Sequence, residues 1–395
     1  YNQLTQSNMS SYEMIKEVEE TFKKWSPAIF VGHNSTAFDD NFLRLSLYKN
    51  LRKPYITNTN GSQRGDSLLL ARATSVFSPN AINVPRNSRG TKVFSLGLLA
   101  DANNIHLTNA HDALADVKAT ASLLSLIKKQ APEMWRSFLL TTSKKGASEF
   151  MQSHSYFCFA PTPTQASVLR YCCDNNDPSK NETYHFNLKY DPMKVVDLDV
   201  TDLEKVILKG SHIKKIKINS TPILMDESYA PYILDEKVDC QTLEKRAKII
   251  ANNHDFIKRL TKAVSNLNTS YPKGKYVEQQ IFDGGFPSSH DEANMAYFHV
   301  APFEEKLQRC LDFEDPKFTK LGLHILYQEN AGLLSKEHFQ KIDQEIKNRI
   351  ESVEEEPFLT LHNAIQSFEK TKEEDPTIGK DLIRDYEKLL ENYVY

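Results

Sequence analysis

Two short clusters of polar residues combine side-chain types that can hold a metal ion and move a proton. The first spans residues 32–40 (GHNSTAFDD) and follows the apolar run 28–31, a pattern that predicts a buried strand ending in a loop. Asp39 falls at the start of the next predicted helix. Such a strand-to-helix loop can bind metals or phosphates. The same residues also fit a simple capping box made by Thr36 and Asp39.

The second cluster, residues 109–116 (NAHDALAD), precedes and opens another predicted helix. His111 has the chemistry of a general base toward water, and Asp116 that of a hard oxygen ligand for Mg²⁺. A structural interpretation also fits: Asp112 caps the helix, Asp116 is a favourable charge in its first turn, and His111 is a loop residue.

The elements that must position these clusters are predicted from hydrophobic periodicity. Helices are expected from Ser10, from about Thr36, over 66–73, from 94–99 and over 112–129, with the strand 28–31 among them. Strand followed by helix indicates an α/β layer. The buried stripe of the last helix is predicted to be Leu114, Val117, Ala121, Leu124 and Ile127.

The hydrophobic periodicity of the sequence changes from helical to alternating after about residue 131. Period-2 segments such as 194–198 and 213–218, separated by polar clusters, predict a β-rich domain with a few helices up to residue 270. Beyond it, amphipathic stretches such as 336–353 and 381–393 predict a helical domain. We therefore expect three domains, 1–130, 131–270 and 271–395.

Composition restricts the class of protein. The 395 residues suffice for two or three globular domains, and the net charge of −3 means that a polyanion must be held by a local basic groove. Five cysteines without a C-x-x-C pair predict reduced thiols in a cytoplasm. No apolar run approaches the ~20 residues that a membrane helix needs, and nothing in the sequence calls for more than a monomer.

Taken together, the two clusters resemble the second and third motifs of the DEDDh 3′-to-5′ exonuclease superfamily, and the chain is more closely similar to the exodeoxyribonuclease I family. The motifs follow that family's order and spacing across the chain: 38–40 (FDD), 48–50 (YKN), 54–55 (PY), 81–85 (AINVP), 94–96 (FSL), 109–113 (NAHDA), 218–224 (INSTPIL) and 280–284 (QIFDG).

The resemblance implies an RNase H-like exonuclease domain, a Src-homology-3-type β-barrel and a helical C-terminal domain. It implies Mg²⁺-dependent release of 5′-mononucleotides from the 3′ end of single-stranded DNA, in repair and recombination, and interaction with the single-stranded DNA-binding protein. By match to the family motifs, Asp39 and Asp116 hold two divalent metals, Mg²⁺ or alternatively Mn²⁺, and His111 is the general base. The positions that match DNA contacts are Arg44, Tyr55, Arg72 and Ser95.

Three departures from the family pattern bear on this expectation. Thr59 stands at an aromatic DNA-contacting position of the family, and it cannot stack on a base as a large ring can. Ser95 stands where the family often has an arginine, so it can donate a hydrogen bond but brings no charge. The family's first motif, Asp-x-Glu, has no counterpart ahead of Asp39, where the only acidic residues are Glu13, Glu17, Glu19 and Glu20 on the first predicted helix. We therefore expect an exonuclease fragment that is truncated at its N-terminus and inactive as printed. The alternative is a protein that binds single-stranded DNA without cutting it.

Overall fold

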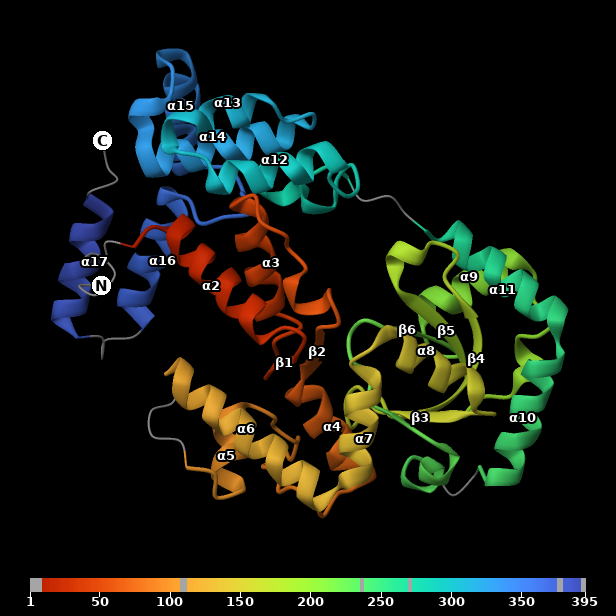
Figure 1. Cartoon of the computed structure of the whole chain (residues 1–395). Coiled ribbons are helices and arrows are strands. Elements are labelled where there is room, and N and C mark those ends of the chain that lie inside the picture. The colour runs from red at the N-terminus through yellow and green to blue at the C-terminus, as the bar shows by residue number, and fades with distance from the viewer. Residues whose placement is uncertain (1–8, 107–111, 235–237, 269–271, 375–378, 392–395) are drawn as a thin grey trace. The chain divides into compact units, whose positions relative to one another are not determined.

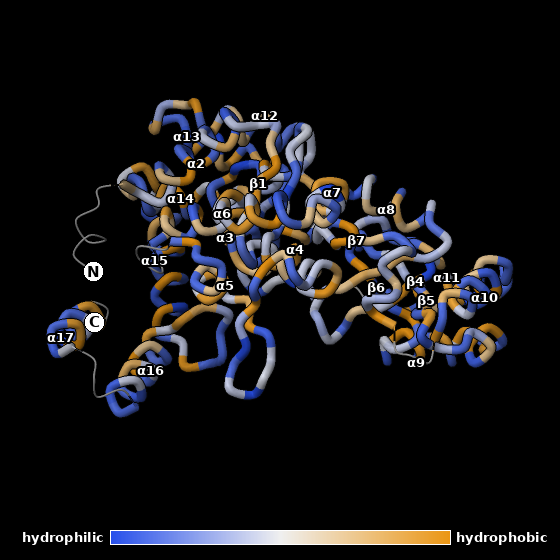
Figure 2. The backbone as a smooth tube through the Cα atoms, turned by 90° about the horizontal axis from the view of Figure 1, so that it is seen from below, coloured by the Kyte–Doolittle hydropathy of each residue, from blue (hydrophilic) through white to orange (hydrophobic). Residues whose placement is uncertain are grey.

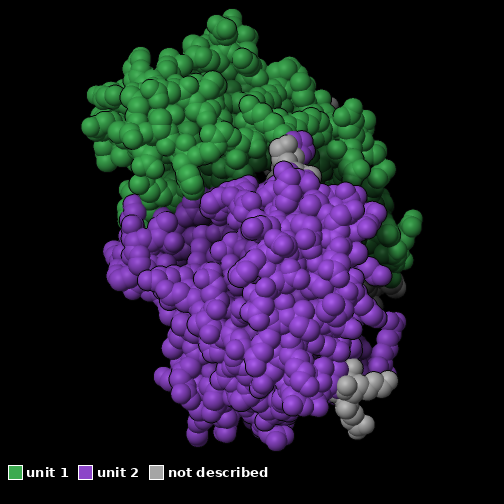
Figure 3. All heavy atoms as spheres, turned by 90° about the vertical axis from the view of Figure 1, so that its right-hand side faces the viewer, with its two compact units in different colours: residues 1–21, 45–54, 273–395 green, residues 22–44, 55–272 purple. Residues whose placement is uncertain are grey.

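The computed structural model describes residues 9–106, 112–234, 238–268, 272–374 and 379–391. The chain forms two compact units (Figure 3): residues 22–44 with 55–272, and residues 1–21 and 45–54 with 273–395. Helices α2 (Ser11–Trp25) and α3 (Asp39–Lys49) each supply residues to both units. The three sequence-based domains divide the chain differently, and that division stays a prediction.

The unit 22–272 opens with a parallel pair of strands. β1 (Ile29–Gly32) pairs with β2 (Gln63–Asp66), so that Gly32 stands opposite Asp66 at the carboxyl ends of both strands. The predicted strand 28–31 is thereby confirmed within one residue. A Cβ added to Gly65 would lie 2.4 Å from the Phe138 ring, so β2 and α7 (Pro132–Thr141) pack together only because residue 65 has no side chain.

Three further helices cover this part of the unit (Figure 1): α4 (Ser67–Phe77), α5 (Leu96–Ala102) and α6 (Ala113–Gln130). The predicted buried stripe of α6 is wrong for Leu114, Val117 and Ala121, which are exposed, whereas Leu124 is half-buried and Ile127 is buried. Leu114 and Val117 are 62% and 64% exposed, and the helix buries Ala119, Thr120 and Leu123 together with Ile127. Because α6 is apolar on more than one face, its periodicity cannot tell which face packs.

The same unit contains a five-stranded sheet in the order β6-β5-β4-β3-β7, all of whose strand pairs are antiparallel. Its strands are β3 (Phe157–Phe159), β4 (Ser167–Asp174), β5 (Glu182–Asn187), β6 (Ile213–Lys217) and β7 (Leu224–Met225), with helices α8 (Lys144–Ser153), α9 (Val200–Lys209), α10 (Cys240–Asn252) and α11 (His254–Asn266) between and after them. The strand predicted at 213–218 is confirmed, whereas 194–198 ends a 3-10 helix and forms a turn. Val195 and Val196 are buried there, which explains the apolar pattern without a strand.

The other unit is helical, as predicted for the C-terminal region. It contains the 3-10 helix η5 (Val277–Phe282) and the helices α12 (Ser289–Val300), α13 (Phe303–Leu311), α14 (Pro316–Asn330), α15 (Lys336–Glu351), α16 (Leu361–Glu374) and α17 (Lys380–Glu391). Orange apolar stretches alternate with blue polar ones along the chain (Figure 2), as expected of amphipathic helices. The core of this helical unit is centred on the fully buried Phe298 and Leu326.

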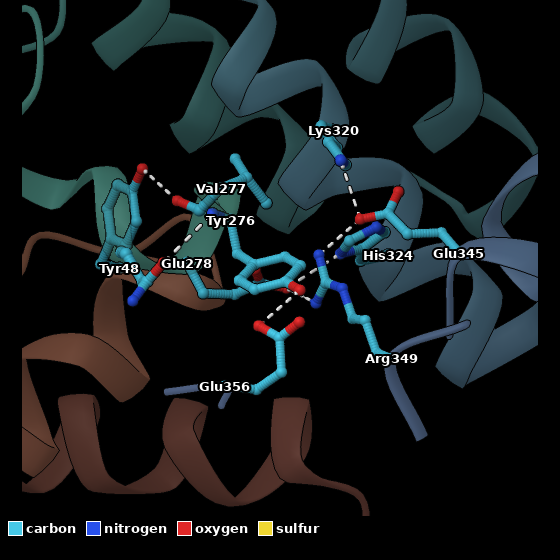
Figure 4. Close-up of polar contacts among 10 residues, drawn as sticks. Tyr48, Tyr276, Val277, Glu278, Lys320, His324, Glu345, Arg349 and Glu356 are labelled. Carbon is cyan, nitrogen blue, oxygen red and sulfur yellow. Dashed lines mark hydrogen bonds and ion pairs between the residues drawn. The ribbon is translucent and has the colours of Figure 1, made fainter. Parts of the chain in front are cut away.

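A polar network joins η5 to α14 and α15 (Figure 4). Arg349 Nη1 binds Glu278 Oε1 at 3.0 Å, and His324 Nδ1 lies 3.3 Å from the same oxygen. Burial raises the pKa of Glu278, but hydrogen bonds from His324 and Arg349 outweigh it and lower the pKa to about 2. The pair Lys320–Glu345 extends the network at 2.8 Å. These contacts stabilise the helical unit.

All five cysteines are free thiols, as predicted for a reduced protein. Among the described residues, no helix is both long and apolar enough to cross a membrane.

Candidate active site

The first polar cluster lies at the carboxyl ends of the two parallel strands. Asp66 ends β2 and is only 2% exposed. Its Oδ1 accepts hydrogen bonds from the N–H groups of Asn34 (2.8 Å) and Leu68 (3.0 Å), and its Oδ2 accepts one from Thr36 N–H at 3.2 Å. One carboxylate therefore caps α4 and fixes the loop after β1. The sequence predicted a helix that begins at Asp66, and an aspartate in such a position signals a helix cap. Nothing local predicts its hydrogen bonds to Asn34 and Thr36.

His33 links this loop to two neighbouring segments. Its Nδ1 lies 2.9 Å from Ser67 Oγ on α4, and its Nε2 donates to Phe94 O at 2.9 Å. Burial lowers the pKa of His33, against the effect of the bond to Phe94 and of the Asp66 charge. Arg72 lowers the pKa further, and Asp116 raises it. Arg72 and Asp116 therefore both lie within electrostatic range of the His33 ring.

Asp39 and Asp40 form the first turn of α3, where the positive end of the helix favours carboxylates. Asp39 is exposed, and Asp40 is half-buried in an ion pair with Arg64 at 2.7 Å. Burial raises the pKa of Asp40. The positive charges of Arg64 and Arg44 act against this effect, and the carboxylates of Asp66 and Asp39 add to it. The first cluster is thus an acidic site with arginines beside it.

Two of the predicted DNA-contacting residues lie together next to this turn. The Arg44 guanidinium carbon lies 5.2 Å from the centre of the Tyr55 ring. Burial, and then the positive charge of Arg64, lower the pKa of Arg44. An arginine remains charged under such conditions, so a positive group and an aromatic ring stand side by side.

The second cluster opens α6. Asp112 caps the helix by accepting a hydrogen bond from Ala115 N–H at 3.0 Å, and Asp116 is half-buried in its first turn. The structural interpretation of Asp112 is therefore confirmed, and it leaves Asp116 available as a ligand. His111, the predicted general base, lies outside the described residues.

Ser95 occupies the N-cap position of α5, but its hydroxyl makes no capping hydrogen bond. It is exposed and directly follows Phe94, whose carbonyl binds His33. Ser95 is therefore tied to the loop after β1 through its neighbour, while its hydroxyl stays free to donate.

The donors at this site suit a hard divalent cation. Asp39 and Asp116 offer carboxylate oxygens, the atoms that Mg²⁺ prefers, and neither is engaged in an ion pair within the described part of the chain. Burial lowers the pKa of His33, the charges of Asp66 and Asp116 raise it, and that of Arg72 lowers it further. The donor chemistry of Asp39 and Asp116 suits magnesium.

Comparison with known proteins identifies the fold. Residues 275–392 match the model of the exonuclease I C-terminal domain. A solved exonuclease I from Methylocaldum szegediense superposes with a TM-score of 0.82 at 22% identity, covering 98% of this chain and 84% of that one. Exonuclease I of Escherichia coli in complex with a dA16 oligonucleotide gives the same TM-score at 20% identity. The match covers 97% of this chain and 84% of that one.

Curated sequences agree. Exodeoxyribonuclease I of Haemophilus influenzae is 29% identical over 321 residues, which are 74% of this chain and 66% of the relative. Exodeoxyribonuclease I of Buchnera aphidicola subsp. Schizaphis graminum is 26% identical over 330 residues, which are 79% of this chain and 67% of the relative. The fold is that of a class of DNA exonucleases. The chain is similar to exonuclease I proteins along most of its length, and its matches span about two thirds of the length of these curated relatives.

Proposed function

We propose that this protein hydrolyses single-stranded DNA from its 3′ end and releases 5′-mononucleotides. The observation that carries the proposal is the acidic first turn of α3, with Asp39 and Asp40, which lies after the loop that Asp66 holds and beside Arg64. Carboxylates for metals and arginines for phosphates thus lie at one edge of the parallel strands. The DNA complex of the E. coli relative supports the choice of substrate.

In this proposal Asp39 and Asp116 hold Mg²⁺, and Mn²⁺ is the alternative ion. When bound, the two ions stabilise the attacking and leaving oxygens of the phosphodiester. His111 takes a proton from the attacking water at an imidazole nitrogen, which requires a neutral ring.

The remaining predicted site residues orient the strand. Arg44 and Arg72 attract phosphates, Tyr55 offers a ring for stacking, and Ser95 donates a hydrogen bond without charge. These roles follow the family motifs. The exposed or half-buried position of all four residues supports them.

Architecture and partners complete the proposal. We assign the parallel-strand part to an RNase H-like domain (1–130), the antiparallel sheet to a Src-homology-3-type barrel domain (131–270) and the helices to a C-terminal domain (271–395). A solved relative titled ExoI/SSB-Ct complex, 19% identical, supports the single-stranded DNA-binding protein as partner. The cellular setting is DNA repair and recombination in the cytoplasm.

A second candidate is binding of single-stranded DNA without hydrolysis. It is favoured by one observation: no Asp-x-Glu triplet precedes Asp39 in these 395 residues, and later triplets such as 202–204 and 312–314 lie in α9 and beyond α13. Within these 395 residues the proposed metal ligands are Asp39 and Asp116. We accordingly expect the 395-residue chain to bind the 3′ end but to release little nucleotide.

The test compares the chain with a version extended by a strand that carries the family's Asp-x-Glu motif, using a 5′-labelled oligonucleotide and Mg²⁺. Nucleotide release by the extended version, abolished by Asp116→Ala, is the result expected of the exonuclease. DNA binding without release in both versions would support the second candidate. Robust release by the unextended chain, abolished by Asp116→Ala, would show that two carboxylates suffice.

A further inference from the structure

A hairpin between α4 and α5 carries concentrated positive charge. Residues 78–95 connect α4, which bears Arg72, to α5, and the hairpin lies in their second half, 83–95. Between Asp66 and Asp101 the sequence has no acidic residue, and its basic residues are Arg72, Arg86, Arg89 and Lys92. In a chain with a net charge of −3, this segment stands out as a local basic element.

The hairpin is held in shape by its own hydrogen bonds. Arg86 and Lys92 face each other in an antiparallel bridge. At the tip, Asn87 Oδ1 accepts from the N–H groups of Arg89 and Thr91, both at 3.0 Å. Gly90 takes a φ of +75°, which favours glycine, and its carbonyl accepts from Arg86 Nη1 at 2.6 Å. A preformed arm loses little conformational entropy on binding a ligand.

The positive charges on this arm are not neutralised. Arg86 and Arg89 are exposed, and within the described part of the chain neither they nor Lys92 forms an ion pair. Lys92 is half-buried and donates to Ser75 O at 2.8 Å, so it anchors the arm to α4. Burial and the charge of Arg86 both lower the pKa of Lys92, as expected where like charges gather.

The base of the arm is fixed to the candidate active site. Phe94 O accepts the hydrogen bond from His33, and Ser95 follows. Asn83 and Asn103 join the other side of the base to the end of α5, with Asn83 N–H donating to Asn103 Oδ1 at 2.8 Å. Six residues separate Arg89 from Ser95, so the tip lies at most about 20 Å from the site along an extended strand.

We propose that this basic arm, Arg86 and Arg89 above all, binds phosphates of the single strand outside the active site. The inference rests on the proposed function and deepens it. Because Ser95 brings no charge, the arm supplies electrostatic attraction that the site itself lacks at that position. Phosphates suit the arm since exposed guanidinium groups bind them bidentately and independently of base sequence.

The experiment measures binding of a labelled dA16 oligonucleotide by fluorescence anisotropy, in EDTA, from about 50 to about 200 mM salt. The variants are Arg86→Gln/Arg89→Gln, the charge-preserving Arg86→Lys/Arg89→Lys, and Arg89→Gln alone, which leaves the Arg86–Gly90 bond intact. The matched control is Lys258→Gln/Lys262→Gln, which removes two exposed charges from α11 in the same unit.

The double glutamine variant should bind about 10-fold more weakly at low salt, and the slope of log K against log salt should fall by about 1.4, because each phosphate contact on a single strand contributes about 0.7. The lysine variant and the control should stay within about 3-fold of the unaltered chain. Arg89→Gln should show about half the change in slope.

Unaltered affinity and slope in both glutamine variants would overturn the inference while the proposed function stands. A parallel titration with a labelled acidic peptide gives a second way to overturn it. If the glutamine variants lose affinity for that peptide but not for dA16, the arm binds a protein partner and not DNA. Failure of the unaltered chain to bind dA16 would instead overturn the proposed function and, with it, the inference.

Discussion

The Oδ1 atom of Asp66 accepts a hydrogen bond from Asn34 N–H at 2.8 Å, and this contact joins the ends of the two parallel strands. Asn34 takes a φ of +64°, so the loop turns back sharply there. The strand pairing brings Gly32 opposite Asp66, and the carboxylate then sets the direction of the chain toward α3. The position of Asp39 thus depends on a residue that touches no substrate in the proposed mechanism.

Replacing this carboxylate should destabilise the unit. In Asp66→Ala the N–H groups of Asn34, Thr36 and Leu68 lose their partner in a buried setting, so we expect the free energy of unfolding to fall by about 3 kcal/mol. Urea unfolding measures it. The control is Asp112→Ala, an exposed N-cap, for which about 1 kcal/mol is expected. Equal losses in the two variants would show that Asp66 acts as a helix cap only.

The metal site can be tested without measuring catalysis. Asp116→Asn and Asp39→Asn each replace a charged ligand by a weaker one, so we expect Mn²⁺ or Mg²⁺ affinity to fall at least about 10-fold in each. Isothermal titration measures this, with the exposed Asp101→Asn on α5 as the matched control. Unchanged affinity in both variants would place the metals elsewhere.

The contact of Gly65 with Phe138 predicts an intolerance to any side chain at residue 65. Gly65→Ala should lower the free energy of unfolding by about 1–3 kcal/mol, because the new Cβ overlaps a fully buried ring. In a double-mutant cycle with Phe138→Leu, the two losses should not add, since the smaller side chain frees the space. Gly379→Ala meets no atom within 4 Å and should cost less than about 1 kcal/mol, the loss expected for alanine at the N-terminus of α17. Additive losses would contradict the steric explanation.

Much of this architecture follows from the sequence because local signals and tertiary packing agree. Ser10 caps α2 as predicted, because its Oγ accepts a hydrogen bond from Glu13 N–H, and the strand 28–31 and the C-terminal helices lie where periodicity puts them. Residues of the two clusters lie where the pattern put them, after β1 and in the first turns of α3 and α6.

The remainder could not be predicted because it depends on which surfaces meet. The face of α6 that packs is chosen by its neighbours, so Leu114 is exposed although the pattern favours its burial. The hydrogen bonds of Asp66 to Asn34 and Thr36 arise from the pairing of β1 with β2, whose partner residues are 34 positions apart, and no local motif predicts them. Val195 and Val196 gave a strand-like pattern because a buried turn can contain the same β-branched apolar residues as a buried strand.

A buried histidine should make the helical unit sensitive to mild acid. His299 Nε2 donates to Leu51 O at 3.0 Å, and its Nδ1 accepts from the Tyr12 hydroxyl at 2.8 Å, an arrangement that suits the neutral ring. Burial, and then the charge of Arg52, lower the pKa of His299 to about 4. In the unfolded chain the pKa returns to about 6.5.

Because the unfolded state binds the proton more readily, the stability due to neutral His299 is complete above about pH 6.5 and is lost as the pH falls toward 4. We expect a loss of about 1–3 kcal/mol across this window, measured by urea unfolding at successive pH values. His299→Gln keeps a donor and an acceptor without titrating, so its stability should change less between pH 6.5 and 4. The exposed His362→Gln should retain the full pH dependence of the unaltered chain. Identical profiles for all three proteins would show that His299 is not the titrating group.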